Sequence, residues 1–353
     1  MTVNSGATLD SDSLPGQLLG VLRGLTGSPG LEYARPPERL TGGFWAELIA
    51  FSLSDPPPGW AGELVARVMP DPDVARKETI VQVAVAAAGF PTPAVRASGG
   101  PEAGLGRAFM IMDRAAGRPL LSGLDGIAAV AQGTRLLRRI PETLAATTAK
   151  LHSLDPKPVR SQLDSVRHVV GASVPSRLEA LRQIAIRYGR ADLTRAAQWL
   201  IDHPPLPAPD VICHGDLHPF NLLIDGDQIT VLDWSSALVG PRAHDVAFTS
   251  LLLAEPPLAV PRRLRPVVRL LGRRMASRFI RAYQHHSGAT TCPQELQWHQ
   301  ALVCLRALTD VSGWAYEGQA RAHAGHPWFV LGPAFAARLT AATGVQIQLS
   351  NFW

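Results

Sequence analysis

Residues 211–221 read VICHGDLHPFN, and residues 231–234 read VLDW a short distance further on. Between them, the apolar runs Leu222–Ile224 and Ile229–Leu232 flank Asp225-Gly226-Asp227, which is a strong signal for a β-hairpin. The stretch therefore predicts a strand, a tight loop rich in polar residues, a hairpin, and an aspartate directly after the hairpin. Because a hairpin reverses the chain, Asp233 is expected to return to the loop that precedes it.

Three residues of this stretch have the types and spacing that phosphoryl transfer requires. The reaction needs a carboxylate to orient the attacking hydroxyl and accept its proton, and oxygen ligands to hold Mg²⁺ against the phosphates. The D-x4-N spacing of Asp216 and Asn221 matches the protein-kinase catalytic loop, and Asp233 stands where that fold has its second metal carboxylate. Asp and Asn near a turn are often simple caps, but the joint pattern is much rarer. It favours Asp216 as the catalytic base and Asn221 and Asp233 as metal ligands.

The stretch resembles the aminoglycoside-phosphotransferase and choline-kinase superfamily, whose signature is H-G-D-x-x-x-x-N followed by an apolar-Asp-aromatic motif. The resemblance covers roughly residues 40–254. It implies an α+β, protein-kinase-like fold with a small antiparallel-sheet N-lobe and a larger, mainly helical C-lobe. It also implies an enzyme that uses ATP and Mg²⁺ to phosphorylate a hydroxyl group of a small molecule, with GTP left open as the donor.

The resemblance extends to further site residues. The expected nucleotide-binding set comprises a turn over the phosphates, a basic residue with its helix partner, and a hinge that holds adenine. These are Gly42 and Gly43, then Arg67 and Glu78, then Met112, Asp113 and Ala115. His214 is expected to brace the catalytic loop, and Asp245 to tie that loop to the C-lobe or to cap a helix. His152 is interpreted as a packing or capping residue.

Two positions depart from the usual pattern of this superfamily. Arg67 stands where lysine is common, which keeps the charge but changes its geometry to a planar fork. Ser235 follows Asp233-Trp234 where many relatives carry an acidic residue. The second departure leaves metal binding intact and leaves open the branch of the superfamily and its substrate.

The order of patterns along the chain predicts three regions. Residues 1–26 are expected to form an extension with a short helix at Leu14–Leu25, residues 27–116 the nucleotide-binding N-lobe, and residues 117–353 the C-lobe. Within the N-lobe, the expected elements are three strands, a helix and a strand before the hinge. They span Glu38–Leu40, Trp45–Ser52, Glu63–Val68, Asp73–Ala88 and Arg107–Asp113.

Composition predicts an ordinary globular protein of the cytoplasm. Of the 353 residues, 46% are hydrophobic and 18% charged, and no apolar run reaches the ~20 residues that a membrane-spanning helix needs. The polar start of the chain does not resemble a signal peptide. Cys213, Cys292 and Cys304 form no CxxC pair, so neither a disulfide framework nor a zinc site is expected.

Charge bears on the acceptor. After Trp234 the chain carries twelve arginines and only five acidic residues, and Arg262, Arg265, Arg269 and Arg273 fall on one helical face. A solvated helix surface is the favoured interpretation of that face. Because a site for a polycation needs several carboxylates, we expect a neutral or anionic acceptor. Two alternatives stay open: a catalytically silent nucleotide-binding protein of the same fold, and, less favoured, a nucleic-acid-binding protein that uses the arginine-rich segment.

Overall fold

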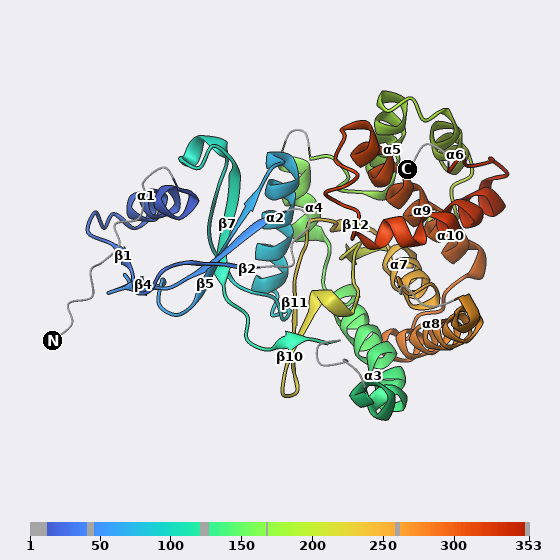
Figure 1. Cartoon of the computed structure of the whole chain (residues 1–353), viewed down its shortest axis with the longest axis horizontal. Helices are drawn as coiled ribbons and strands as arrows, with labels where there is room; N and C mark the ends of the chain where they lie inside the picture. Colours follow the sequence, from blue (N-terminus) through green and yellow to red (C-terminus); the bar gives the residue numbers. More distant parts are fainter. Residues whose placement is uncertain (1–12, 41–45, 121–126, 167–168, 258–261, 350–353) are drawn as a thin grey trace.

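The computed structural model describes residues 13–40, 46–120, 127–166, 169–257 and 262–349. The chain forms two lobes (Figure 1), with an antiparallel sheet in the N-lobe and mostly helices in the C-lobe. The α+β, kinase-like architecture expected from the sequence is therefore confirmed.

The N-lobe is built on a five-stranded antiparallel sheet with the order β2-β3-β5-β7-β6. The strands are β2 (Glu38–Leu40), β3 (Glu47–Phe51), β5 (Leu64–Met69), β6 (Val95–Gly99) and β7 (Ala108–Asp113). The central strand, β5, is buried along its whole length, which explains its nearly continuous apolar sequence. Of these strands, β6 was not expected, because its residues VRASG carry little strand signal.

Two helices cover this sheet from opposite sides. Helix α1 (Leu14–Thr26) packs Leu18 and Leu22 against β3 and β5, and a short pair of strands, β1 (Glu32–Tyr33) and β4 (Leu53–Ser54), lies beside it. Helix α2 (Pro72–Ala87) contacts β6 and β7 and begins at Asp71, whose side chain accepts from the backbone N–H groups of Asp73 and Val74. Asp71 is thus an ordinary helix N-cap.

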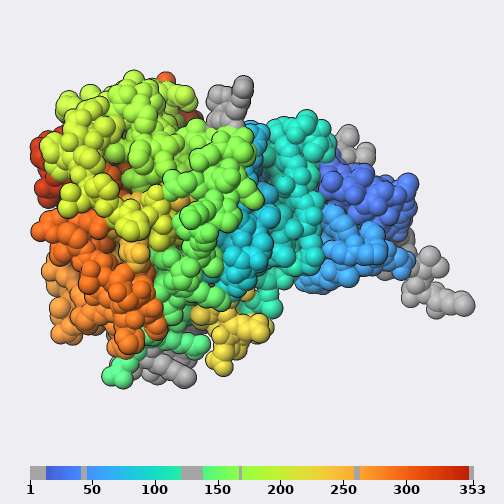
Figure 2. Space-filling model, turned by 180° about the vertical axis from the view of Figure 1, so that it is seen from behind, coloured from blue at the N-terminus to red at the C-terminus, as the bar shows by residue number. Residues whose placement is uncertain are grey.

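Helix α2 also joins the lobes. Val81 and Val85 are fully buried in a core that contains Trp234, Ala237 and Val239 of the C-lobe. In the space-filling view from behind (Figure 2), the α3–α4 region, in green, lies against α2, in cyan, and α2 contacts α4. One face of α2 therefore belongs to the C-lobe core.

The C-lobe consists of helices around the segment that carries Asp216 and Asp233. They are α3 (Ile127–His152), α4 (Lys157–Ser165), α5 (Val174–Arg187), α6 (Ala191–Asp202), α7 (Ala243–Ala254), α8 (Arg265–Ser287), α9 (Pro293–Tyr316) and α10 (Pro327–Thr343). No described helix is long and apolar enough to cross a membrane. Arg265, Arg269 and Arg273 of α8 are exposed, as expected for a solvated helix face.

The expected hairpin is present. Strands β10 (Leu222–Asp225) and β11 (Gln228–Val231) pair antiparallel, and β8 (Arg118–Pro119) adds a third strand to them. The strand before the catalytic loop, β9 (Asp210–Cys213), pairs with β12 (Leu238–Pro241). These pairings fix both ends of the segment that carries Asp216 and Asp233.

Candidate active site

The catalytic loop turns sharply where β9 ends. Gly215 has a φ of +74°, and a Cβ on it would lie 2.2 Å from the carbonyl oxygen of Ser236. Only glycine tolerates both this backbone conformation and this close approach. The turn leaves Asp216, the expected base, half-buried directly after it.

The carboxylate of Asp245 holds this turn through hydrogen bonds to its backbone. One carboxylate oxygen accepts from the N–H of His214 at 2.8 Å and the other from the N–H of Gly215 at 2.7 Å. His152 lies 3.2 Å from the same carboxylate through Nε2, and its Nδ1 is 2.8 Å from the Tyr283 hydroxyl. Burial alone would raise the pKa of Asp245, but the hydrogen bond and charge of His152 help to lower it to about 2. Asp245 lies in the first turn of α7, whose N-cap is Arg242, so it ties the loop to the C-lobe and is not a helix cap.

His214 connects the loop to the end of the hairpin. Its Nε2 lies 3.1 Å from the carbonyl oxygen of Leu232, and its ring packs 4.8 Å from that of the buried Trp234. Burial lowers the pKa of His214, so the neutral ring donates to that carbonyl. Trp234 in turn donates its indole N–H to Thr92 at 2.9 Å. The bracing geometry expected for His214 is therefore present.

Asn221 and Asp233 are brought together by the hairpin. The N–H of Leu232 donates to the carbonyl of Asn221 at 2.9 Å, and the side-chain amide of Asn221 donates to the carbonyl of Asp216 at 3.0 Å. Asp233 adopts a φ of 65°, which non-glycine residues rarely do. Such backbone strain is typical of functional sites, and here Asp233 reaches Arg67 of the N-lobe.

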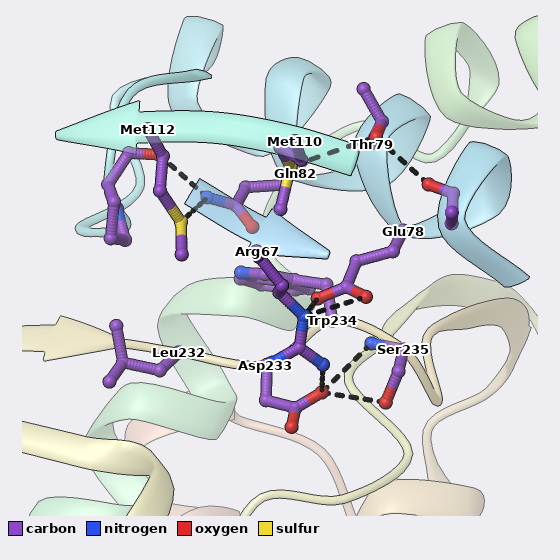
Figure 3. A network of polar contacts seen from close by, with 12 residues as sticks. Arg67, Glu78, Thr79, Gln82, Met110, Met112, Leu232, Asp233, Trp234 and Ser235 are labelled. Carbon is purple, nitrogen blue, oxygen red and sulfur yellow. Dashed lines mark hydrogen bonds and ion pairs between the residues drawn. The ribbon is translucent and has the colours of Figure 1, made fainter. Parts of the chain in front are cut away.

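Arg67 and Glu78 meet Asp233 in one network (Figure 3). Nε of Arg67 lies 3.1 Å from Oε1 of Glu78, and its Nη2 donates to Oδ1 of Asp233 at 3.0 Å. The Ser235 hydroxyl donates to the same Oδ1 at 2.6 Å. The ion pair expected between β5 and α2 is therefore confirmed. We call Arg67, Glu78 and Asp233 the paired cluster.

The charges of the paired cluster depend on one another. Burial would raise the pKa of Asp233, but the charge of Arg67 and the Ser235 hydrogen bond lower it to about 2. Burial raises the pKa of Glu78 to about 7, against the opposing charge of Arg67. For Arg67 itself, the charges of Glu78 and Asp233 outweigh burial and raise its pKa. Arg67 is thus a fully charged guanidinium between two carboxylates.

The atoms offered by Asn221 and Asp233 fit Mg²⁺. The Asn221 amide nitrogen is engaged with the loop, which leaves its oxygen as the ligand atom, and Asp233 is ionised at neutral pH. Carboxylate and amide oxygens are the ligands that Mg²⁺ prefers. In this structure Arg67 supplies the positive charge beside Asp233.

The other expected nucleotide-binding residues are distributed as follows. Met112 and Asp113 end β7 and Ala115 follows, all three half-buried at the connection between the lobes. The Asp113 carboxylate pairs with Arg96, at 2.6 Å, so it is engaged on the sheet surface. Gly42 and Gly43 lie outside the described residues.

His152, Cys213 and Asp245 form a compact buried group whose possible metal ligands lie within 4.8 Å of one another. His152 and Asp245 are hydrogen-bonded to each other and to Tyr283 and the loop, however, and the Cys213 thiol faces the carbonyls of Gly240 and Pro241. Burial raises the pKa of Cys213 well above its usual value, so the thiol keeps its proton. The group braces the loop and does not fit a metal.

Sequence reasoning missed a second group of charged residues behind the loop: Lys77, Arg177 and Arg306, which we call the basic cluster. Arg306 donates to the carbonyl of Gly215 at 3.1 Å and to the Ser236 hydroxyl at 2.7 Å, and Arg177 donates to the carbonyl of Ser236 at 2.7 Å. For Lys77 a signal existed, since it precedes Val81 and Val85 by one and two helical turns on an apolar face. For the two arginines we find no such signal, because only the tertiary fold brings α5 and α9 to the loop.

The sequence matches the phosphotransferase enzyme family over residues 55–302. This match covers most of the chain and includes the catalytic loop, the hairpin and the paired cluster. The chain belongs to this family. None of the curated protein sequences matches it.

Solved structures share the fold at low sequence identity. A candidate aminoglycoside phosphotransferase from Ralstonia eutropha superposes with a TM-score of 0.64 at 18% identity, covering 93% of this chain and 98% of that one. A thermostable mutant of aminoglycoside phosphotransferase APH(4)-Ia, in a ternary complex with ADP and hygromycin B, gives 0.55 at 17% identity, covering 92% and 97%. A choline/ethanolamine kinase family protein from Mesorhizobium loti gives 0.50 at 18% identity, covering 94% and 100%.

Proposed function

We propose that this protein is a kinase that transfers the γ-phosphate of ATP to a hydroxyl group of a small molecule. The observation that carries the proposal is the convergence of Asp216, Asn221, Asp233 and the Arg67–Glu78 pair where the two lobes meet. Family membership supports small-molecule phosphotransfer. Similar folds are known with ADP and with GDP, which supports a nucleotide donor.

In the proposed reaction, the acceptor oxygen bonds to the γ-phosphorus while the bond from that phosphorus to the ADP oxygen breaks. Asp216 accepts the proton of the acceptor hydroxyl, and Arg67 holds the phosphates, oriented by Glu78. Mg²⁺, when held by Asn221 and Asp233, supplies positive charge to the phosphate oxygens. Most of the catalytic effect then comes from positioning and charge neutralisation.

The acceptor is proposed to be neutral or anionic. Around Asp216 the carboxylate of Asp310 is accompanied by Arg306 and His326, and the positive charge of Arg306 disfavours a polycation there. The arginine excess after Trp234 adds a field that repels cations at long range. Phosphorylation of kanamycin with a micromolar KM would contradict this part of the proposal.

The test is transfer of labelled γ-phosphate from ATP to a panel of hydroxylated metabolites and antibiotics, with wild type and Asp216→Asn in parallel. Loss of a positioned base lowers kcat by about 10²–10⁴-fold. Nucleotide affinity should stay unchanged, because Asp216 faces the acceptor. A silent nucleotide-binding protein would bind ATP and label nothing, and wild-type turnover by Asp216→Asn would refute the assignment of the base.

A further inference from the structure

Lys77 is a largely buried side chain with no partner among the described residues. Only 4% of the residue is exposed, and it makes no hydrogen bond or ion pair with any residue that the structure describes. Lysine is almost never fully buried unless its charge is paired. An ammonium group in such a place therefore calls for an explanation.

The position of Lys77 on α2 shows where it faces. Val81 and Val85 follow it at intervals of four residues, and both pack into the C-lobe core beside Trp234 and Ala237. Residues at this spacing share one face of a helix. Lys77 therefore lies on the face of α2 that is turned to the C-lobe, whereas its neighbour Glu78 pairs with Arg67.

The two arginines of the basic cluster contact Ser236, in the loop 235–237 of the C-lobe. Arg177 comes from α5 and Arg306 from α9, and both donate to Ser236, as described above. Arg306 also donates to the carbonyl of Gly215, the residue directly before Asp216. The basic cluster therefore gathers positive charge from both lobes around the catalytic turn.

Close negative partners for this charge are scarce. Among the described residues, the carboxylate that approaches the cluster within 4 Å is that of Asp310, 3.9 Å from Nε of Arg306. Arg177 is served by backbone carbonyls and by His244, whose pKa burial holds well below its usual value, so that ring is neutral.

The more distant charges do not change this balance. Asp216 and Asp245 act on Arg177 only at longer range, and Asp245 is already occupied by the loop. Burial, together with the charges of Arg177 and Arg306, lowers the pKa of Lys77 well below its usual value, although Glu78 and Asp71 oppose this. A positive potential therefore remains at Lys77.

We propose that the basic cluster is a subsite for an oxyanion, a carboxylate or phosphate group, that the acceptor carries besides its reactive hydroxyl. This rests on the proposed function and narrows its acceptor class to anionic molecules. Lys77 and Arg306 contact the oxyanion, and the buried Arg177 adds positive charge without contacting it. We assign the subsite to the acceptor because Arg306 donates to the carbonyl of Gly215, directly before Asp216. The phosphates of the nucleotide are instead assigned to Arg67 and Asp233 of the paired cluster.

The experiment measures anion binding with the nucleotide site already filled. Full-length protein is saturated with Mg²⁺ and a non-hydrolysable ATP analogue, and inorganic phosphate and, separately, malonate are titrated at constant ionic strength. The same titrations are repeated without the analogue. Binding is followed by calorimetry and by the thermal midpoint. Lys77→Met is compared with Lys150→Met, which removes an exposed lysine on α3.

Wild type and Lys150→Met should bind the anion and gain thermal stability from it. Lys77→Met should bind it about ten- to a hundredfold more weakly, the usual effect of losing a hydrogen bond to a charged group. Equal anion affinity in Lys77→Met and Lys150→Met would refute the subsite, as would the absence of anion binding in wild type. Loss of anion binding only when the analogue is present would assign the cluster to the phosphates of ATP, which also refutes it.

A failure of the proposed function has a different signature in the same experiment. If the analogue itself does not bind, the kinase proposal fails, whatever the anion does. Once acceptors are found, Lys77→Met should raise the KM of an anionic acceptor at least tenfold and leave the KM of ATP unchanged.

Discussion

The paired cluster and the basic cluster flank the same catalytic turn, but they balance their buried charges differently. In the paired cluster, Arg67 lies between two carboxylates at 3.0 and 3.1 Å. In the basic cluster, Arg177 and Arg306 are served mainly by carbonyl and hydroxyl oxygens, and Lys77 by no described residue. Buried charges are normally paired, so the charges of the first cluster balance within the protein, whereas the second cluster keeps an excess of positive charge.

The largest expected contrast is in stability. Removing one partner of a buried ion pair destabilises by about 3–5 kcal/mol, so Arg67→Met should lower the free energy of unfolding by that amount. Lys77→Met removes a largely buried amine that has no partner among the described residues, and it keeps the approximate length of the side chain. It should therefore leave the stability unchanged or increase it in a buffer without polyvalent anions. Denaturant midpoints of the two variants test this, and an equally large loss in both would mean that Lys77 has a structural partner.

Asp245 is the anionic counterpart of the basic cluster. It is fully buried, and no arginine or lysine of the described residues forms an ion pair with it, yet two backbone N–H groups and His152 satisfy it. Its case shows that hydrogen bonds can replace an ion pair in this core, which explains how Arg177 is tolerated. Lys77 has neither kind of support among the described residues.

Asp245 gives the second prediction, on acid stability. Its folded pKa of about 2 lies below the unfolded value of about 3.9, so its contribution is present above pH 4 and is lost as the pH falls toward 2. The shift corresponds to about 2–3 kcal/mol at pH 7. Asp245→Asn should lose at least this amount at pH 7, because the amide offers one acceptor oxygen where two are used. It should also unfold with a weaker pH dependence between pH 4 and 2.

The matched control is Asp164→Asn, an exposed carboxylate on α4. It should follow the wild-type curve of unfolding free energy against pH. An Asp245→Asn curve that runs parallel to wild type down to pH 2 would show that Asp245 does not titrate as its surroundings imply.

The sequence predicted the Arg67–Glu78 pair and assigned Asp233 to the same site, because these residues lie in recognisable local patterns, but it did not predict the ion pair between Arg67 and Asp233. Asp233 follows a hairpin with a strong turn signal, and Glu78 lies on a helix with a clear start, so the topology of the family was enough to bring them to Arg67. The basic cluster could not be found in this way. Arg177 and Arg306 lie on separate helices, and no recognisable motif places either helix against the loop; Arg306 also lies beyond the residues that carry the resemblance. The burial of Lys77 depends on how α2 docks on the C-lobe. Strand β6 was missed for a simpler reason, since its small and polar residues carry little strand propensity.

Ser235 tests how far the paired cluster is organised for a metal. Its hydroxyl donates to Oδ1 of Asp233 at 2.6 Å, the same oxygen that Arg67 contacts, and both interactions keep the carboxylate ionised and fixed. Groups that orient a metal ligand typically contribute at least tenfold to metal affinity. Ser235→Ala should therefore weaken the Mg²⁺-dependent part of ATP affinity by about tenfold, or ~1.4 kcal/mol, and leave Mg²⁺-independent binding unchanged.

Asp233→Ala, which removes the ligand itself, should abolish the Mg²⁺ dependence, and Ser176→Ala, on α5, serves as a control. Calorimetry with and without Mg²⁺ separates these cases. If Ser235→Ala binds Mg²⁺·ATP like wild type, the serine only caps the turn after Asp233, and Arg67 alone positions the carboxylate.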